Sequence, residues 1–274
     1  MSEPVQYDFD RETALEELGG HRHQVQLASN WNIGDNPNGG YLTAIGLQAI
    51  RRLGNHPDPI SVTTHYLRPG SSGQSGEVSA ELIRSGRSVT SGRASLVQDG
   101  RSRIEVMASM GDLSGASGHE YEITVPPPDI PPPEDCVERD GLEQGVALFI
   151  ASRIDLRVDP ERAKAGASDT AEMFGWIRFA DGREPDTLGL TLFADAFAPS
   201  IFTRLGRVGW VPTIELTVHI RRRPAPGWVL GRFVTEDLHD GRMIEDGWLW
   251  DSTGSLVARS RQLAMLLPDA DTSS

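Results

Sequence analysis

Residues 61–69 read SVTTHYLRP and residues 215–224 read ELTVHIRRRP, two stretches that share the order of their apolar, histidine, arginine and proline positions. They lie 154 residues apart. Two further anchors recur in the same order at offsets of 154 and 155: Gly86-Arg87 followed by Gly92 with Gly241-Arg242 followed by Gly247, and the turn Asp99-Gly100 with Thr253-Gly254. Such spacing is typical of an internal repeat. The chain is therefore predicted to contain two copies of one unit.

Each unit reads as a buried helix followed by an antiparallel meander. Residues 38–50 are apolar on nearly every side and are followed by Gly54, which predicts a buried central helix. Alternating segments rich in Val, Ile and Thr follow it, at 59–69, 76–85, 88–99 and 102–112. The second half is expected to have one long helix over 187–205 and strands near 147–157, 172–181, 212–222, 228–238, 243–251 and 255–266. A central helix wrapped by an antiparallel sheet, built twice, is an α+β fold.

A proline-rich stretch separates the two units. Residues 114–145 contain two triple-proline runs, which cannot lie inside a helix or a central strand. We therefore expect an N-terminal repeat over residues 1–113, a linker over 114–145, and a C-terminal repeat with a short polar tail over 146–274.

The composition excludes several classes of function. The 274 residues carry a net charge of −13, the opposite sign to that of a nucleic-acid binder. No apolar run is long enough for a membrane span and no signal peptide is visible, so we expect a cytoplasmic protein. The single cysteine, Cys136, lies in the proline-rich stretch, a poor place for a nucleophile. The histidines are scattered, with only His21 and His23 close together, so no metal site is expected.

The order of these segments resembles that of the double-hotdog acyl-CoA thioesterases. The resemblance covers roughly residues 20–112 and 146–267 and is carried by the Asn-x-Gly-Gly opening of the first helix, by ADAFAP at 194–199 followed by WVPTIELT at 210–217, and by LVARSRQLA at 256–264. It is greatest to the actinobacterial branch of the acyl-CoA thioesterase II-like family. The resemblance implies a cofactor-free hydrolase of fatty acid metabolism that forms homo-oligomers.

That family hydrolyses acyl-CoA to a carboxylic acid and CoA without a covalent intermediate. The resemblance implies that Asp195, Thr213 and Gln262 hold and activate the attacking water. The interval from Thr213 to Pro224 is about one residue longer than the family pattern, so Thr217 remains an alternative to Thr213.

The surroundings of Asp195 agree independently with a role as a base. It is the acid in an otherwise apolar run, LGLTLFADAF at 188–197. Burial raises the pKa of a carboxyl group towards that of a useful general base, and hydrogen bonds limit the rise. Pro199 lacks the N–H that would bond the Asp195 carbonyl, which predicts a kink in the helix. The alternative is a structural Asp that caps a helix or bridges to the other repeat.

The two remaining members of this set lie on predicted strands. Gln262 lies on the same face of its strand as Ala258, Ser260 and Ala264, and its amide can both donate and accept a hydrogen bond. An exposed strand glutamine is the alternative. Strict alternation places Thr213 and Thr217 together on one face of their strand, where Glu215 and His219 are interpreted as a half-solvated set.

Asn38-Gly39-Gly40-Tyr41 opens the first helix and is a candidate substrate-binding segment. The glycines would let a ligand approach, and the free N–H of Gly40 or Tyr41 would polarise the thioester carbonyl. A helix cap with close packing is an equally good interpretation. Tyr41 occupies the position offset by 154 from Asp195, so one site per chain is expected.

Two other functions remain open alongside the hydrolase. A hotdog-fold dehydratase or hydratase normally uses a His and an acid, and neither predicted helix carries a His. A non-catalytic acyl-thioester binding protein would need the fold but not Asp195. The run Arg221–Arg223 could contact CoA phosphates, or it could be a charged strand end.

Overall fold

The computed structural model describes residues 6–115, 121–139 and 145–267. Its helices, including short 3-10 turns labelled η, are α1 (Asp8–Glu12), η1 (Ser29–Trp31), α2 (Gly39–Arg51), η2 (Pro133–Asp135), η3 (Phe149–Ser152), α3 (Gly189–Phe193) and α4 (Ile201–Leu205). None of these is long and apolar enough to cross a membrane.

Strands make up most of the regular secondary structure in the described residues. They are β1 (Glu16–Gly19), β2 (Arg22–Gln26), β3 (Asn32–Ile33), β4 (Asn36–Pro37), β5 (Asp58–Tyr66), β6 (Ser75–Ser85), β7 (Thr90–Gln98), β8 (Arg101–Gly111), β9 (Val137–Glu138), β10 (Ile154–Val158), β11 (Glu172–Phe179), β12 (Thr213–Ile220), β13 (Val229–His239), β14 (Arg242–Trp250) and β15 (Leu256–Met265). The four strands predicted after each central helix are all present. Strands β1 to β4 and β9 were not predicted.

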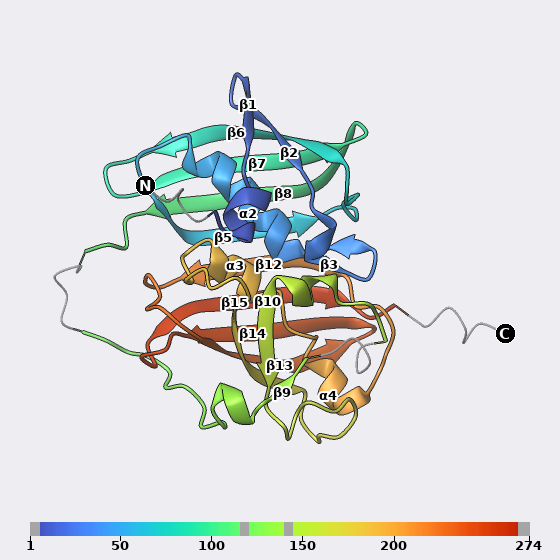
Figure 1. Cartoon of the computed structure of the whole chain (residues 1–274). Coiled ribbons are helices and arrows are strands. Elements are labelled where there is room, and N and C mark those ends of the chain that lie inside the picture. The colour runs from blue at the N-terminus through green and yellow to red at the C-terminus, as the bar shows by residue number, and fades with distance from the viewer. Residues whose placement is uncertain (1–5, 116–120, 140–144, 268–274) are drawn as a thin grey trace.

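Thirteen of the described strands form one sheet. Six strands of each half follow one another outward from the middle in equivalent order, and β9 has no counterpart in the first half. The order across the whole sheet is β1-β2-β6-β7-β8-β5-β12-β15-β14-β13-β11-β10-β9. At the centre β5 pairs antiparallel with β12, and these are the strands that contain the repeated sequences (Figure 1). The two halves are thus joined by direct strand pairing, which confirms the α+β double-hotdog architecture.

Both central strands carry an irregularity at the same place. The pairing of β5 with β8 shifts between Pro59 and Ser61, and the pairing of β12 with β15 shifts between Thr213 and Glu215. A bulge places two residues of one strand opposite one of its partner, which reverses the faces of the residues beyond it. The two bulges are separated by the repeat offset of 154, so the duplication extends to backbone detail.

Helix α2 is the central helix of the first half. Ten of its 13 residues are buried, as expected of a helix without a polar face. Asn38 caps its first turn, because its side chain accepts a hydrogen bond from the Tyr41 N–H at 3.0 Å. The helix lies directly against the strands of its own half and against α3 of the other half (Figure 1).

The expected single helix over 187–205 is wrong. The chain forms two short helices, α3 and α4, and residues 194–200 between them are not helical. Pro199 supplies a physical reason, since it has no N–H to donate to the carbonyl of Asp195. That carbonyl instead accepts a hydrogen bond from the side-chain amide of Asn38 at 2.8 Å. The helix that was predicted to be kinked near Asp195 is therefore interrupted completely.

The proline-rich stretch packs along the second half of the sheet. The indole of Trp250 donates to the Val125 carbonyl at 2.8 Å, and that of Trp176 donates to the Pro131 carbonyl at 2.9 Å. Strand β9, which lies within residues 114–145, pairs with β10 and ends the sheet. This part of the stretch thus belongs structurally to the second half, and Arg139 follows directly after β9.

Candidate active site

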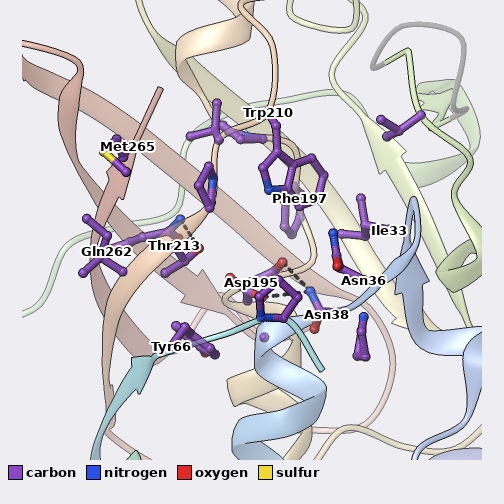
Figure 2. A pocket seen from close by; sticks show the side chains of 18 of the residues that line it. Ile33, Asn36, Asn38, Tyr66, Asp195, Phe197, Trp210, Thr213, Gln262 and Met265 are labelled. Atoms are coloured by element: carbon purple, nitrogen blue, oxygen red, sulfur yellow. Dashed lines mark hydrogen bonds between the residues drawn. The ribbon is translucent and has the colours of Figure 1, made fainter. Parts of the chain in front are cut away.

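A cavity of about 690 Å³ opens where the start of α2, the broken helix and the ends of β12 and β15 meet. Asp195, Thr213 and Gln262 all line it, although they come from three separate elements of the second half (Figure 2). The structure therefore brings together the three residues that the sequence indicated.

Asn38 of the first half holds Asp195 of the second half. Its side-chain amide donates to Oδ2 of Asp195 at 2.9 Å, in addition to the bond with the Asp195 carbonyl. The backbone N–H of Gly40 donates to the same Oδ2, also at 2.9 Å. The side-chain oxygen of Asn38 thus caps α2, and its side-chain nitrogen donates hydrogen bonds to Asp195. The carboxylate lies at a helix N-terminus, where a negative charge is favoured.

These contacts set the proton affinity of Asp195. Its carboxyl group is surrounded by protein and open only to the cavity, and this loss of water raises its pKa to about 6. The backbone N–H groups of Gly40 and Gly39, the Asn38 amide and the charge of Arg139 oppose the rise. The group is therefore mostly ionised at neutral pH and can still accept a proton, as a general base must.

Gln262 and Thr213 form a second polar pair on the cavity wall. The Gln262 Nε2 donates to Oγ1 of Thr213 at 2.8 Å (Figure 2). Gln262 is only 8% exposed, on the inner face of β15, opposite Leu216 of β12. The bulge between Thr213 and Glu215 moves Thr213 onto this inner face, whereas strict alternation would have placed it outside with Thr217.

Thr217 does not reach the cavity. Its hydroxyl lies 2.8 Å from that of Thr63 and donates to Oε1 of Glu215 at 2.6 Å, on the opposite face of the sheet. Of the two candidate hydroxyls, only that of Thr213 is positioned near Gln262.

The start of α2 does not offer its N–H groups to a ligand in the expected way. The Gly40 N–H is directed to Asp195 and the Tyr41 N–H to Asn38. A Cβ on Gly40 would lie 2.6 Å from the Thr191 carbonyl oxygen, so this glycine lets α2 and α3 approach each other. The Tyr41 side chain is buried against Trp31. Only Gly39 lines the cavity, and the alternative interpretation of a cap with close packing fits Gly40 and Tyr41.

Two family models match this chain. Residues 27–111 match the acyl-CoA thioesterase N-terminal domain, and residues 133–266 match the acyl-CoA thioesterase C-terminal domain. The chain belongs to the acyl-CoA thioesterase family. It is a thioester hydrolase.

This chain is similar to solved structures and to sequence relatives over most of its length. A candidate thioesterase II from Thermobifida fusca is 31% identical, with a TM-score of 0.86 over 95% of this chain and 98% of that chain. A hot dog fold protein from Alicyclobacillus acidocaldarius superimposes with a TM-score of 0.82 at 22% identity, over 97% of this chain and all of that one. The thioesterase-like protein TwmA of Talaromyces wortmannii is 24% identical over 322 residues, which cover 94% of this chain and 92% of that protein.

The thioesterase cavity also contains charged residues that the sequence did not point to. Arg139, from the proline-rich stretch, donates to the Ala196 carbonyl, and desolvation lowers its pKa to about 10. Nothing in its local sequence distinguishes it from a linker arginine. Glu245, on β14, is 6% exposed and also lines the cavity. The sequence contains a pattern that could have identified Glu245. It is an acid at an inward position, between Met243 and Gly247 of an alternating strand.

The run Arg221–Arg223 does not line the cavity of the thioesterase. Arg223 forms a two-pronged ion pair with Asp58, with distances of 2.8–3.1 Å, and Arg222 pairs with Glu122 at 2.6 Å. Arg68 and Arg207 line the cavity instead. No group of three His, Cys, Asp or Glu side chains suited to a metal ion occurs in the part of the chain that the structure describes.

Proposed function

We propose that this thioesterase hydrolyses acyl-CoA to a carboxylic acid and CoA by direct attack of a water molecule that Asp195 activates. Thr213 and Gln262 orient that water, and no covalent intermediate forms. The observation that carries the proposal is the arrangement of the cavity wall. It combines a carboxylate whose pKa is raised to about 6 with a donor–acceptor pair from two neighbouring strands.

The chemistry follows from the proton affinities. Ionised Asp195 takes a proton from water as the water oxygen bonds to the thioester carbonyl carbon. The tetrahedral intermediate then collapses, its C–S bond breaks, and the proton held by Asp195 passes to the departing sulfur. The hydrogen bond from the Gln262 Nε2 leaves the Thr213 hydroxyl proton free to contact the water. The Gly40 N–H, at the N-terminus of α2, donates to the Asp195 carboxylate and so opposes the rise in its pKa. This contact helps to keep the base ionised between turnovers.

The remaining wall of the cavity fits the two ends of the substrate. Apolar side chains suit an acyl chain, and they include Leu42, Phe197, Phe202, Phe233 and Met265. Arg68 and Arg207 supply positive charge for the CoA phosphates on a protein that is otherwise acidic. We further propose that the enzyme works in the cytoplasm as a homo-oligomer.

A thiol-release assay with a series of acyl-CoAs tests the proposal. We expect Asp195→Asn to lower kcat about 10³-fold, within the range attributed to a general base. Glu215→Gln is the matched control, because Glu215 is on β12 near Thr213 but faces away from the cavity. Full activity of Asp195→Asn would overturn the mechanism. Failure of the wild-type enzyme to release thiol from any acyl-CoA would overturn the substrate class, and consumption of an enoyl-CoA without thiol release would indicate a hydratase.

A further inference from the structure

A second carboxyl group, that of Glu245, lines the same cavity and has no part in the chemistry described above. Glu245 on β14 is the direct strand partner of Gln262 on β15, so both side chains lie on the inner face of the sheet. Burying a carboxyl group costs free energy unless it is hydrogen-bonded. Glu245 is only 6% exposed, so its burial must be compensated by specific contacts.

Glu245 also contacts the segment that carries Asp195. Its Oε2 accepts a hydrogen bond from the backbone N–H of Ser200 at 2.6 Å. Ser200 is fully buried, at the far end of the non-helical stretch 194–200, and its hydroxyl lies 2.8 Å from that of Thr235 on β13. The first two residues of this stretch still donate to α3, Ala194 N–H to the Leu190 carbonyl and Asp195 N–H to the Leu192 carbonyl, both at 3.0 Å. Its far end, at Ser200, is fixed by these contacts with β13 and β14.

Glu245 thus connects the two sides of the site. On one side it is the neighbour of Gln262, and on the other it anchors the stretch that begins at Asp195. Resting on the proposed function, we infer that Glu245 is a positioning residue of the hydrolytic site, which fixes Asp195 relative to the Gln262–Thr213 pair by clamping the Ser200 N–H.

The electrostatic surroundings make this clamp sensitive to pH. Desolvation raises the pKa of Glu245 to about 7, the charges of Asp195 and Asp246 add to the rise, and hydrogen bonds to Ser200 oppose it. The strands beside it place neutral groups opposite, Thr235 on β13 and Gln262 on β15. The other ionisable groups on the cavity wall are Tyr66, Arg68, Arg139 and Arg207.

Ionisation of Glu245 therefore strengthens the site in two ways. A charged acceptor makes a stronger hydrogen bond to the Ser200 N–H. A second negative charge in the cavity also makes ionised Asp195 a stronger base. Since the two carboxyl groups titrate as a coupled pair, kcat/KM is expected to rise in two steps, near pH 6 and near pH 7.

Two substitutions separate the clamp from the charge. Glu245→Gln keeps an oxygen acceptor for the Ser200 N–H, so we expect kcat within about threefold of wild type and a pH profile that lacks the upper step. Glu245→Leu removes the acceptor, and we expect kcat to fall about 30-fold with KM nearly unchanged, since small displacements of catalytic groups cost this much. Asp246→Asn is the matched control for the clamp, because Asp246 is next to Glu245 on β14 but pairs with Arg261 on the outer face. We expect wild-type kcat, with the upper step of the pH profile retained and moved only to lower pH, since the charge of Asp246 adds to the rise in the pKa of Glu245.

Hydrogen exchange of a peptide covering residues 194–205 gives a readout that does not depend on activity. We expect faster exchange in Glu245→Leu and wild-type exchange in Glu245→Gln. The inference would be overturned if Glu245→Leu kept wild-type kcat and wild-type exchange. It would also be overturned if Glu245→Gln lost as much kcat as Glu245→Leu and still showed a two-step pH profile. Absence of hydrolysis by the wild-type enzyme would instead overturn the proposed function, and hydrogen exchange would still decide whether Glu245 holds the segment.

Discussion

The hydroxyl oxygens of Thr63 and Thr217 lie 2.8 Å apart, although 154 residues separate them in the chain. This separation equals the repeat offset, so two equivalent residues meet where β5 and β12 pair. They mark the approximate two-fold axis of the molecule. A residue on such an axis contacts its own counterpart, whereas a residue away from the axis, such as Thr213, can acquire a different environment in each half.

The two threonines of β12 are therefore expected to differ in function. Thr213→Val removes the hydroxyl that Gln262 contacts and should lower kcat about 10²-fold, as expected for the loss of a group that orients the nucleophile. Thr217→Val, on the outer face, should leave kcat within twofold. Steady-state kinetics on one acyl-CoA measure both variants. Equal loss of activity in the two would contradict the assignment.

Ionised Asp195 is expected to lower the free energy of unfolding of the enzyme. Its folded-state pKa, about 6, is above its ordinary value, so stability present below about pH 4 is lost as pH rises through 6. Asp195→Asn should therefore raise the free energy of unfolding by about 2 kcal/mol at pH 8 and by much less at pH 4. Denaturant unfolding at the two pH values checks this. A variant less stable than wild type at pH 8 would refute the expectation.

Asn38→Asp should change the pH dependence of activity without removing the helix cap. An Asp at this position can still accept from the Tyr41 N–H. It cannot donate to Asp195, and it places a second negative charge beside that carboxylate, which raises the pKa of Asp195 above 6. The lower limb of kcat/KM should move to higher pH, with activity partly recovered in alkaline buffer. A limb that stays near pH 6 would argue against this contact.

Gly40→Ala tests the close approach of the two helices. The added Cβ would lie 2.6 Å from the Thr191 carbonyl oxygen and 2.7 Å from the Leu192 Cα, both backbone atoms that cannot turn aside. We expect a loss of about 2 kcal/mol in stability together with a fall in kcat, because α2 must move away from Asp195. Gly115→Ala is the control, since a Cβ there meets nothing within 4 Å. An unaffected Gly40→Ala enzyme would show that the helices can separate freely.

Arg223 is expected to matter for stability and not for CoA binding. Its guanidinium pairs with Asp58, a carboxylate with 4% exposure that also accepts from the Leu113 N–H and the Thr187 hydroxyl. Arg223→Ala should lower the unfolding free energy by about 1–2 kcal/mol, since the pair is partly exposed, and leave KM for acyl-CoA unchanged. Arg68→Ala should raise KM. The opposite pattern would place CoA at Arg221–Arg223.

Much of this arrangement could be read from periodicity. The repeat offset predicted the central strands, and the single acid of an apolar run pointed to Asp195. Gln262 was indicated by the family resemblance, and simple alternation gave its face correctly, because β15 has no irregularity at this position. These features depend on local pattern, which a single sequence carries in full.

Other features depend on contacts between distant segments. The bulge before Glu215 reverses the face of Thr213, and alternation alone could not choose between Thr213 and Thr217. The break after α3 relies on Asn38, which is 157 residues away and replaces the missing helical bond. Arg139 reaches the cavity only because β9 adds to the sheet edge. No periodicity reports such tertiary pairings.

The position equivalent to Asp195 in the first half shows what duplication has made possible. Tyr41 occupies it, with its ring stacked on Trp31 and its hydroxyl donating to the Glu12 carbonyl at 2.7 Å. The first half thus has a closely packed aromatic pair at this position. The equivalent region of the second half has an interrupted helix, two buried carboxyl groups, those of Asp195 and Glu245, and a cavity. The two copies of the repeat thus differ in role. The first contributes a well-packed aromatic core, and the second places two buried carboxyl groups beside a cavity, a destabilising arrangement that the packing of the first copy can offset.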